Sequence, residues 1–139
     1  AREAFEVFYR TRNEVTLYDD VLPALAQLRP RYRLFAVSNG NADLATIGLA
    51  RFFEHSLAAR DAGMLKPDPR IFALLLQRAG LAGDQVVHVG DDAVADVEGA
   101  RRAGVTPVWL NRAGKDWPAA AAPPPLTVRT LAELARLFA

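Results

Sequence analysis

The sequence predicts an α/β fold in which a mainly parallel sheet carries helices on both faces. Short apolar runs alternate with segments of helical length along most of the chain, a rhythm typical of parallel sheets. The runs at 86–90 and 106–110 do not alternate between polar and apolar residues, as expected for strands that are buried on both faces. The chain has 139 residues, of which 51% are hydrophobic. This length is enough for one packed domain and too short for two.

Five elements are predicted in the first 60 residues. Apolar residues at helical spacing predict one helix over about 5–9 and another over about 20–30, where Pro30 ends it. The apolar run 34–37 predicts a strand that ends in a turn composition. A helix over 41–49 and a weak strand over 56–59 complete this half.

The remaining elements follow from capping residues and apolar runs. A helix over 69–80 begins after Asp68, a good N-cap, and ends at Gly80. Strands are expected at 86–90 and 106–110, with a helix over about 93–103 between them. Residues 113–125 contain Gly, Ala and three consecutive prolines and indicate a surface connection. Thr130 and Glu133 form a capping-box pattern for a short last helix.

Polar residues that suit phosphate chemistry follow three of the predicted strands. Ser38 and Asn39 follow the first, Lys66 lies in the loop after the second, and Asp91, Asp92 and Asp96 follow the third. Because ligands of open α/β sheets bind at the carboxyl ends of the strands, we expect these groups to share one crevice. A hydroxyl can hold a phosphoryl oxygen, and an ammonium group can neutralise its charge.

The adjacent carboxylates of Asp91 and Asp92 are the most informative feature. Two neighbouring carboxylates repel unless a cation lies between them, and Mg²⁺ prefers such hard oxygen ligands. The plain alternative is that Asp92 only caps the next helix. A cap does not require two aspartates, nor Asp96 one helical turn further on.

Each of the other candidates also has a plain alternative. Lys66 is one of only two lysines in a chain that otherwise uses arginine, which favours a site that needs a compact charge, although it can be a solvated loop residue. Ser38 can be an ordinary turn residue with no role in ligand binding. His88 lies within a strand and is expected to be a hydrogen-bonded interior side chain rather than a catalyst.

Three ordered motifs resemble the haloacid dehalogenase (HAD) superfamily over nearly the whole chain. The matching residues are Ser38-Asn39-Gly40, Lys66-Pro67-Asp68-Pro69, and Gly90-Asp91-Asp92 with Asp96. The resemblance implies a Rossmann-like, HAD-like core. It also implies that Ser38, Asn39 and Gly40 bind the phosphoryl group, that Lys66 bridges the nucleophile and the phosphate, and that Asp91, Asp92 and Asp96 hold or support Mg²⁺.

The acidic pair resembles the phosphatases of this family more than its metal-free dehalogenases, although the Trp-Leu-Asn-Arg stretch at 109–112 is also similar to the dehalogenases. Residues 5–18, with the second and fourth motifs, look most like the flavin mononucleotide phosphatases. The resemblance therefore implies hydrolysis of a small phosphorylated metabolite, with nucleotide and flavin phosphates among the candidates.

The first motif of the family, an Asp-x-Asp that supplies the nucleophile, does not occur in this sequence. We therefore expect residues 1–18 to be the end of a helical cap region, and residues 19–139 to be a core without its nucleophile-bearing central strand. Two inner sheet edges without a partner would cost much of the stability of a domain. We expect the gap to be filled by an upstream piece, by a segment of a second copy, or by direct pairing of the two edges.

The leading function is Mg²⁺-dependent hydrolysis of a phosphate monoester through an aspartyl-phosphate in the full-length protein, with this chain alone inactive. The alternatives are a non-catalytic phosphate-binding or interaction module of the same fold and a haloacid dehalogenase. A receiver domain gathers similar residues, but there the acidic pair comes early in the chain.

Composition excludes several other classes. The net charge is +1 with interleaved acidic and basic residues, so no concentrated positive field points to nucleic acid. No apolar run is long enough to span a membrane. The absence of cysteine excludes thiolate chemistry and disulfides, and we expect a cytoplasmic protein.

Overall fold

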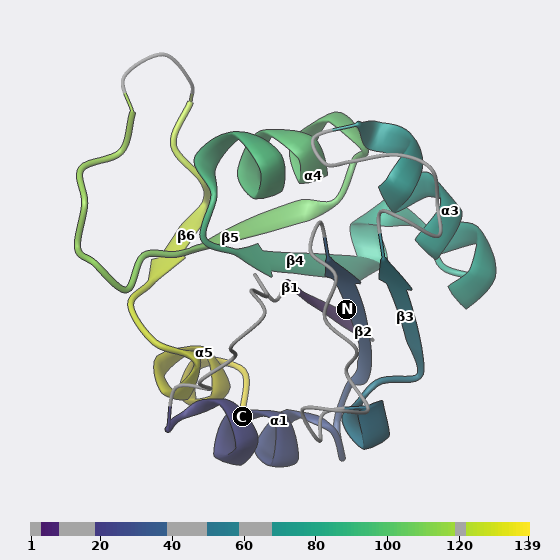
Figure 1. The fold of residues 1–139 in the computed structure, drawn as a ribbon, viewed down its shortest axis with the longest axis horizontal. Coiled ribbons are helices and arrows are strands. Elements are labelled where there is room, and N and C mark those ends of the chain that lie inside the picture. Colours follow the sequence, from purple (N-terminus) through teal and green to yellow (C-terminus); the bar gives the residue numbers. More distant parts are fainter. Residues whose placement is uncertain (1–3, 9–18, 39–49, 59–67, 119–121) are drawn as a thin grey trace.

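The structure is a computed structural model that describes residues 4–8, 19–38, 50–58, 68–118 and 122–139. Its centre is a six-stranded sheet in the order β3-β2-β1-β4-β5-β6, in which all neighbouring strands are parallel (Figure 1). The strands are β1 (Ala4–Phe8), β2 (Arg33–Ser38), β3 (His55–Ala58), β4 (Val86–Gly90), β5 (Thr106–Leu110) and β6 (Leu126–Val128).

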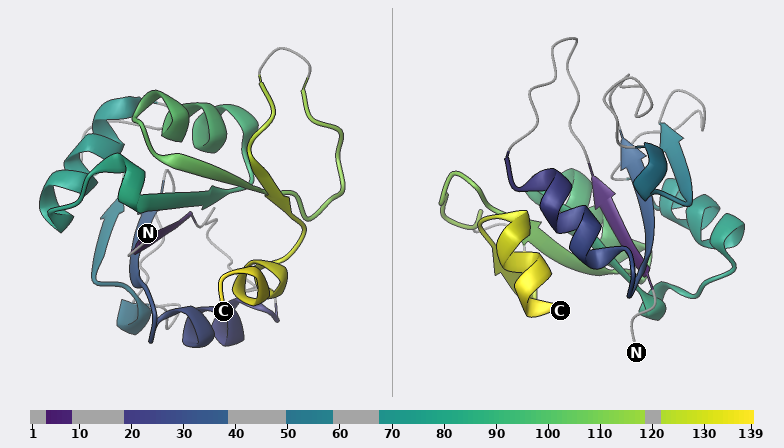
Figure 2. Two further views of the ribbon diagram at one scale, coloured as in Figure 1. Left: turned by 180° about the vertical axis from the view of Figure 1, so that it is seen from behind. Right: turned by 90° about the horizontal axis from the view of Figure 1, so that it is seen from below.

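Helices cover both faces of the sheet, which confirms the predicted fold class. The α-helices are α1 (Val21–Leu28), α3 (Pro69–Ala79), α4 (Gly99–Arg102) and α5 (Leu131–Leu137), and the shorter helical segments are η1 (Ala50–Phe52), η2 (Gly83–Gln85) and the π-helical η3 (Ala93–Glu98). Figure 2 shows α1 and α5 side by side on one face, with α3 and α4 on the other.

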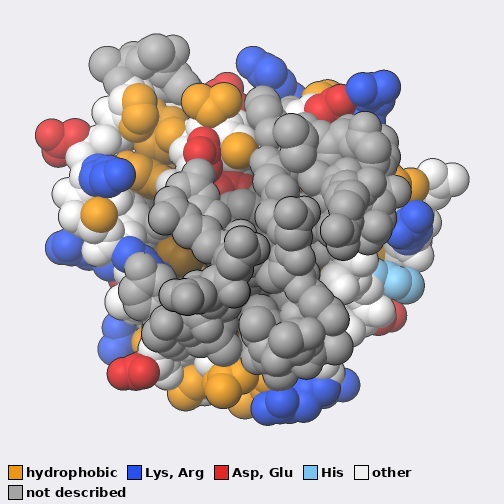
Figure 3. Space-filling model, viewed as in Figure 1, with side chains coloured by type: hydrophobic (Ala, Val, Ile, Leu, Met, Phe, Trp, Pro, Cys, Tyr) orange, Lys and Arg blue, Asp and Glu red, His pale blue; other side chains and the backbone are white. Residues whose placement is uncertain are grey.

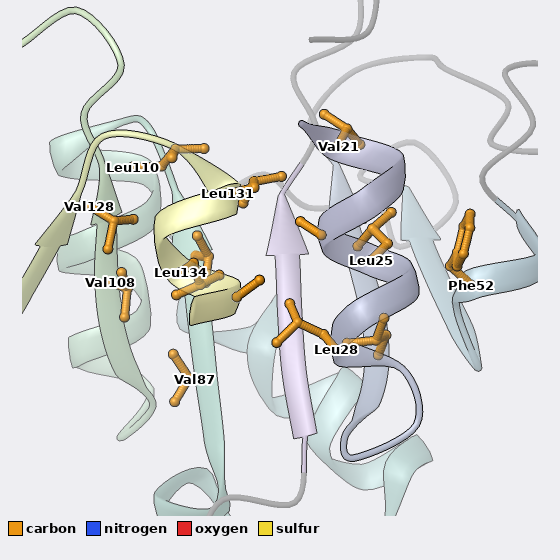
Figure 4. Close-up of a cluster of buried hydrophobic side chains, with 14 of the residues drawn as sticks. Val21, Leu25, Leu28, Phe52, Val87, Val108, Leu110, Val128, Leu131 and Leu134 are labelled. Carbon is orange, nitrogen blue, oxygen red and sulfur yellow. The ribbon is translucent and has the colours of Figure 1, made fainter. Parts of the chain in front are cut away.

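The core consists of two apolar clusters separated by the sheet. Successive residues of β2 alternate between them, as strand geometry requires: Leu34 and Ala36 pack toward α1 and α5, whereas Phe35 and Val37 pack toward α3. Figure 4 shows the first cluster, in which leucines of α1 and α5 meet the valines of β4 and β5. This packing on both faces explains why the predicted strands are continuous apolar runs.

β1 corrects two expectations from the sequence. Residues 4–8 form a strand, so the predicted helix over 5–9 is wrong for this part. The strand lies in the centre of the sheet, with Phe5 paired in register with Leu34 of β2 and Val87 of β4. The central position is therefore occupied by the chain itself, although β1 carries no Asp-x-Asp.

None of the three expected ways of closing the gap is needed, because β1 pairs with both inner edges. Over five residues, the spacing of Phe5 and Phe8 fits a helix, while the alternation of Phe5 and Val7 fits a strand. Pairing with two neighbouring strands decides between them. Residues 9–18 lie outside the described part of the chain, so a cap region there stays a prediction.

Most other elements confirm the prediction closely. The side chain of Asp68 accepts a hydrogen bond from Arg70 N at the start of α3, and Gly80 ends that helix with φ of 69°. Thr130 Oγ1 accepts from Glu133 N at 3.0 Å at the start of α5. The edge strand β6, the short helices η1 and η2, and the π-helical form of η3 were not predicted. The expected helix over 41–49 lies outside the described residues.

Asp20 joins three parts of the fold that are far apart in sequence. Its carboxylate accepts hydrogen bonds from Arg112, at 3.1 and 3.3 Å, and from Leu131 N, at 2.7 Å, and Ala132 N, at 3.3 Å. The carboxylate thus neutralises the positive end of α5. Partial burial raises the pKa of Asp20, but the hydrogen bonds and charge of Arg112 and the two backbone N–H groups outweigh it, so that its pKa is lowered.

Replacement of Asp20 by alanine should lower the free energy of unfolding by about 2 kcal/mol at neutral pH, since charged hydrogen bonds are lost at a helix start. The pKa of Asp20 in the folded protein lies below its ordinary value near 3.8. The stabilisation is therefore fully present at pH values above 3.8, and it is lost as the pH falls through the folded-state pKa. Urea unfolding of both proteins at pH 7 and pH 3 checks it. Asp19→Ala, at the exposed neighbour, is the control, and an equal loss in both variants would contradict the prediction.

Within the described residues, no helix combines the length and the hydrophobicity needed to cross a membrane. On the face shown in Figure 3, the described Lys and Arg side chains are dispersed around the periphery rather than gathered into one patch.

Candidate active site

Two of the predicted site residues stand at the same edge of the sheet. Ala36 of β2 and Val89 of β4 both pair with Val7 of β1. Two residues further along, Ser38 ends β2 and Asp91 directly follows β4, so their backbones lie at the same height on either side of β1. Two strand spacings separate them, about 10 Å. A phosphate group with a metal ion can bridge such a distance.

The other phosphate-binding candidates are not placed. Asn39, Gly40 and Lys66 lie outside the described residues, and the structure describes Ser38 by its backbone alone. Their predicted convergence on one ligand therefore stays a prediction. The acidic turn after β4, defined here as Asp91 and Asp92, is described in full.

The two carboxylates of the acidic turn differ in their surroundings. Asp91 is exposed to solvent. Asp92 is half-buried, and its Oδ1 accepts hydrogen bonds from Val94 N at 2.9 Å and Ala95 N at 2.8 Å. Asp92 is thus the N-cap of η3, as the plain alternative predicted. Asp91 makes the more accessible donor for a cation.

Asp96 lies beneath the acidic turn and is fully buried. Its Oδ1 lies 2.9 Å from Nε2 of His88, and its Oδ2 accepts a hydrogen bond from Asp92 N at 3.0 Å. Because both oxygens have protein partners and the group is shielded from solvent, the geometry favours a supporting role for Asp96 over direct contact with a metal.

His88 is the interior, hydrogen-bonded side chain that the sequence predicted. It has no exposed surface, and its ring forms a T-shaped pair with the ring of Phe72 of α3 at a centroid distance of 4.9 Å. A carboxylate oxygen can only accept, so Nε2 carries the hydrogen in the contact with Asp96. The link between His88 and the acidic turn was not predicted.

Gly90 makes room for Asp96. A Cβ atom placed on Gly90 would lie 2.6 Å from the Cβ of Asp96, which is closer than two carbon atoms can approach. Any larger residue at the end of β4 would displace the Asp96 carboxylate from below the acidic turn. Gly90 thus leaves the space that the Asp96 side chain occupies. This role is visible in the packing and not in the sequence.

Trp109 is a further contact that sequence reasoning missed. It packs in the sheet, with only 6% of its surface exposed. Its indole Nε1 also donates a hydrogen bond to the backbone oxygen of Asp91 at 2.9 Å, and its ring meets the ring of Trp117 at 5.0 Å. In the sheet, Trp109 pairs in register with Gly90 of the neighbouring strand, an alignment that the sequence alone does not show.

The acidic turn has the donor chemistry that Mg²⁺ prefers. This ion takes hard oxygen ligands, uses one or two carboxylates and keeps several waters, and the exposed carboxylate of Asp91 beside that of Asp92 fits this requirement. In the part of the chain that the structure describes, no group of three or more His, Cys, Asp or Glu residues forms a metal site by itself. A metal at this turn would need further ligands from elsewhere.

Residues 2–104 match the sequence model of a protein family, the haloacid dehalogenase-like hydrolases. The chain belongs to this family. The resemblance read from the three motifs is thereby confirmed at the level of the family. A subfamily relation to the flavin mononucleotide phosphatases stays a prediction.

The relatives within the family include phosphatases and dehalogenases. A phosphoserine phosphatase of Thermus thermophilus is 40% identical over 118 residues, which are 81% of this chain and 47% of that protein. A glyceraldehyde 3-phosphate phosphatase of Methanopyrus kandleri is 37% identical over 101 residues, covering 68% of this chain and 43% of that protein. The crystal structure of a 2-haloacid dehalogenase from Pseudomonas syringae superposes with a TM-score of 0.85 at 37% identity, covering 90% of this chain and 54% of that one.

The chain therefore spans about half the length of the relatives it matches. The structural similarity confirms a HAD-like α/β core, and the two phosphatases show that similar sequences occur among phosphate-hydrolysing members.

Proposed function

We propose that the complete protein is a Mg²⁺-dependent phosphatase that hydrolyses a small phosphate monoester. The observation that carries the proposal is the acidic turn, whose exposed Asp91 stands at the carboxyl edge of the sheet, level with Ser38. Family membership and the two phosphatase relatives support it. A bound Mg²⁺ would stabilise the negative charge that develops on the phosphoryl oxygens.

Each candidate residue has a defined task in this proposal. Asp91 holds the cation, with Asp92 beside it and Asp96 as the support beneath. Ser38, with Asn39 and Gly40, binds the phosphoryl oxygens, and Lys66 neutralises the charge between the nucleophile and the phosphate. The nucleophile is an aspartate that forms an aspartyl-phosphate, and it comes from outside this sequence, which has no Asp-x-Asp. In the complete protein, the strand that carries it would take the central position that β1 occupies in this chain.

The substrate is proposed only as a class. The names of the two phosphatases give different substrates, phosphoserine and glyceraldehyde 3-phosphate. What the two substrates share is a phosphate monoester on a small metabolite, with nucleotide and flavin phosphates as further candidates. A cytoplasmic location, and a role without nucleic acid or membrane, stay predictions from composition.

A dehalogenase is the second candidate. It is favoured by the close superposition on the Pseudomonas syringae enzyme and by the Trp-Leu-Asn-Arg stretch over 109–112. The acidic turn argues against it, because displacement of halide by a carboxylate needs no cation beside the leaving group. A non-catalytic module of the same fold is the third candidate.

An assay with para-nitrophenyl phosphate and 2-chloropropionate separates the three candidates. We expect phosphate release by the chain joined to a segment that carries the Asp-x-Asp motif. Excess EDTA should abolish this release, and the chain alone should release less than about 1% as much phosphate, because a missing nucleophile costs several orders of magnitude. Full activity of the chain alone would overturn the assignment of the nucleophile.

The other outcomes also decide between the candidates. Chloride release that EDTA leaves unchanged would establish the dehalogenase. A coding sequence without any upstream Asp-x-Asp, together with no activity on either compound, would favour the non-catalytic module.

A further inference from the structure

We propose that Trp109 and His88 are positioning residues that lock the peptide group between Asp91 and Asp92 and thereby aim the Asp91 carboxylate. The inference rests on the proposed function, since it concerns the residue that would hold the cation. It assigns roles to two buried side chains that the proposed reaction does not otherwise use.

The peptide group between Asp91 and Asp92 is held at both of its polar ends. Its oxygen, which belongs to Asp91, accepts a hydrogen bond from Trp109 Nε1 at 2.9 Å. Its N–H, which belongs to Asp92, donates to Asp96 Oδ2 at 3.0 Å. Because a peptide group is planar and rigid, two bonds at opposite ends fix the orientation of the whole plane.

The two groups that hold this peptide are themselves fixed by packing. Trp109 is 6% exposed in β5, and its ring meets Trp117. Asp96 is fully buried in η3, where its second oxygen lies 2.9 Å from His88 of β4. Both bonds thus come from residues that have little freedom to move, one in β5 and the other in η3.

The two hydrogen bonds anchor the backbone that carries the Asp91 carboxylate. They tie the acidic turn to Trp109 of β5 and to Asp96 of η3, so the turn cannot shift relative to these elements without breaking one of them. Asp91 is exposed, and these hydrogen bonds act on its carboxylate through the backbone that carries it.

Side chains that orient metal ligands have large effects on affinity. Mutation of such supporting partners typically weakens metal binding by about 10-fold to 100-fold. Trp109→Phe keeps an aromatic ring in the core and removes only the N–H donor. It therefore tests the hydrogen bond separately from packing.

The experiment is an NMR titration with Mg²⁺ alone of the complete protein, which includes the segment with the Asp-x-Asp motif, followed by the backbone amide signals of Asp91 and Asp92. We expect Trp109→Phe to weaken Mg²⁺ binding by about 10-fold and to speed hydrogen exchange at the Asp92 amide. Trp117→Phe is the matched control, because it makes the same change in the partner ring and leaves the Trp109 N–H in place. It should change the Mg²⁺ affinity by less than about twofold.

A second pair of variants tests His88 and separates the loss of its hydrogen bond from a loss of folding. Glutamine at position 88 retains an N–H donor of similar reach, whereas leucine has none. We expect His88→Leu to weaken Mg²⁺ binding as Trp109→Phe does, and His88→Gln to restore much of it. A purely structural role would not produce this rescue. Signals from α1 and α5, which lie on the other face of the sheet, report whether each variant is folded.

The possible outcomes separate this inference from the proposed function. Wild-type binding of Mg²⁺ with unchanged affinity in folded Trp109→Phe would overturn the inference and leave the proposed function standing. An Asp92 amide that exchanges equally fast in wild type and in both Trp109→Phe and His88→Leu would also overturn it. If Asp91 and Asp92 in the wild type do not respond to Mg²⁺, the cation assignment itself fails, and with it the positioning role.

Discussion

Replacement of Asp91 by asparagine should reduce Mg²⁺-dependent phosphate release by the complete protein by about 100-fold or more. Asparagine keeps the size and shape of the side chain but lacks its negative charge, and a neutral amide is a poor ligand for a hard cation. Loss of one group that stabilises the developing charge typically costs about 100-fold to 1,000-fold in rate. The rate is measured with para-nitrophenyl phosphate over a range of Mg²⁺ concentrations.

Asp84→Asn is the matched control for this variant. Asp84 is exposed and lies in η2, just before β4, so it stands at the opposite end of the same strand. The two substitutions are identical in chemistry, and Asp84→Asn should leave the rate within about twofold of wild type. Equal rates for both variants would show that Asp91 does not hold the cation and would remove the main support for the phosphatase.

Replacement of Gly90 by alanine should lower the free energy of unfolding by about 3 kcal/mol or more. The added methyl group would lie 2.6 Å from the Cβ of Asp96. Asp96 has little room to withdraw because it is buried and bonded to His88 and to Asp92 N. Overpacking costs about 1 to 3 kcal/mol, and displacement of a buried carboxylate from its partners adds to that cost. Urea unfolding measures the difference.

Gly80→Ala makes the same chemical change where space is not limiting. A Cβ at Gly80 would meet nothing within 4 Å, but φ there is 69°, so the cost is the backbone strain alone, about 1 kcal/mol. A larger loss of stability in Gly80→Ala than in Gly90→Ala would contradict the argument that Asp96 is held rigidly over Gly90.

The sequence could predict most of the fold because local signals and tertiary packing agree in most elements. The helix α3 is an example, since a good N-cap, a tolerated proline and a terminating glycine all mark the same boundaries that packing requires. β1 could not be predicted in this way. Its five residues fit two periodicities, and the hydrogen bonds that decide between them come from β2 and β4, which are distant in sequence.

The candidate site was predictable only as a set of residue types. An acidic pair at a strand end is visible in the sequence, and the structure describes Asp91 and Asp92 as a turn at the expected edge of the sheet. What the sequence cannot show is how these residues are held. The contact of Trp109 with Asp91 depends on how β4 and β5 are aligned, and the contacts of His88 and Gly90 with Asp96 depend on how η3 packs on β4. Residue spacing along the chain determines neither.

The central place of β1 also affects how the protein should be handled. If residues 4–8 were trimmed away, β2 and β4 would each be left with unpaired backbone groups in the middle of the sheet. Open strand edges of this kind are templates for association between molecules, so a trimmed preparation would aggregate through the middle of its sheet rather than through its natural outer edges.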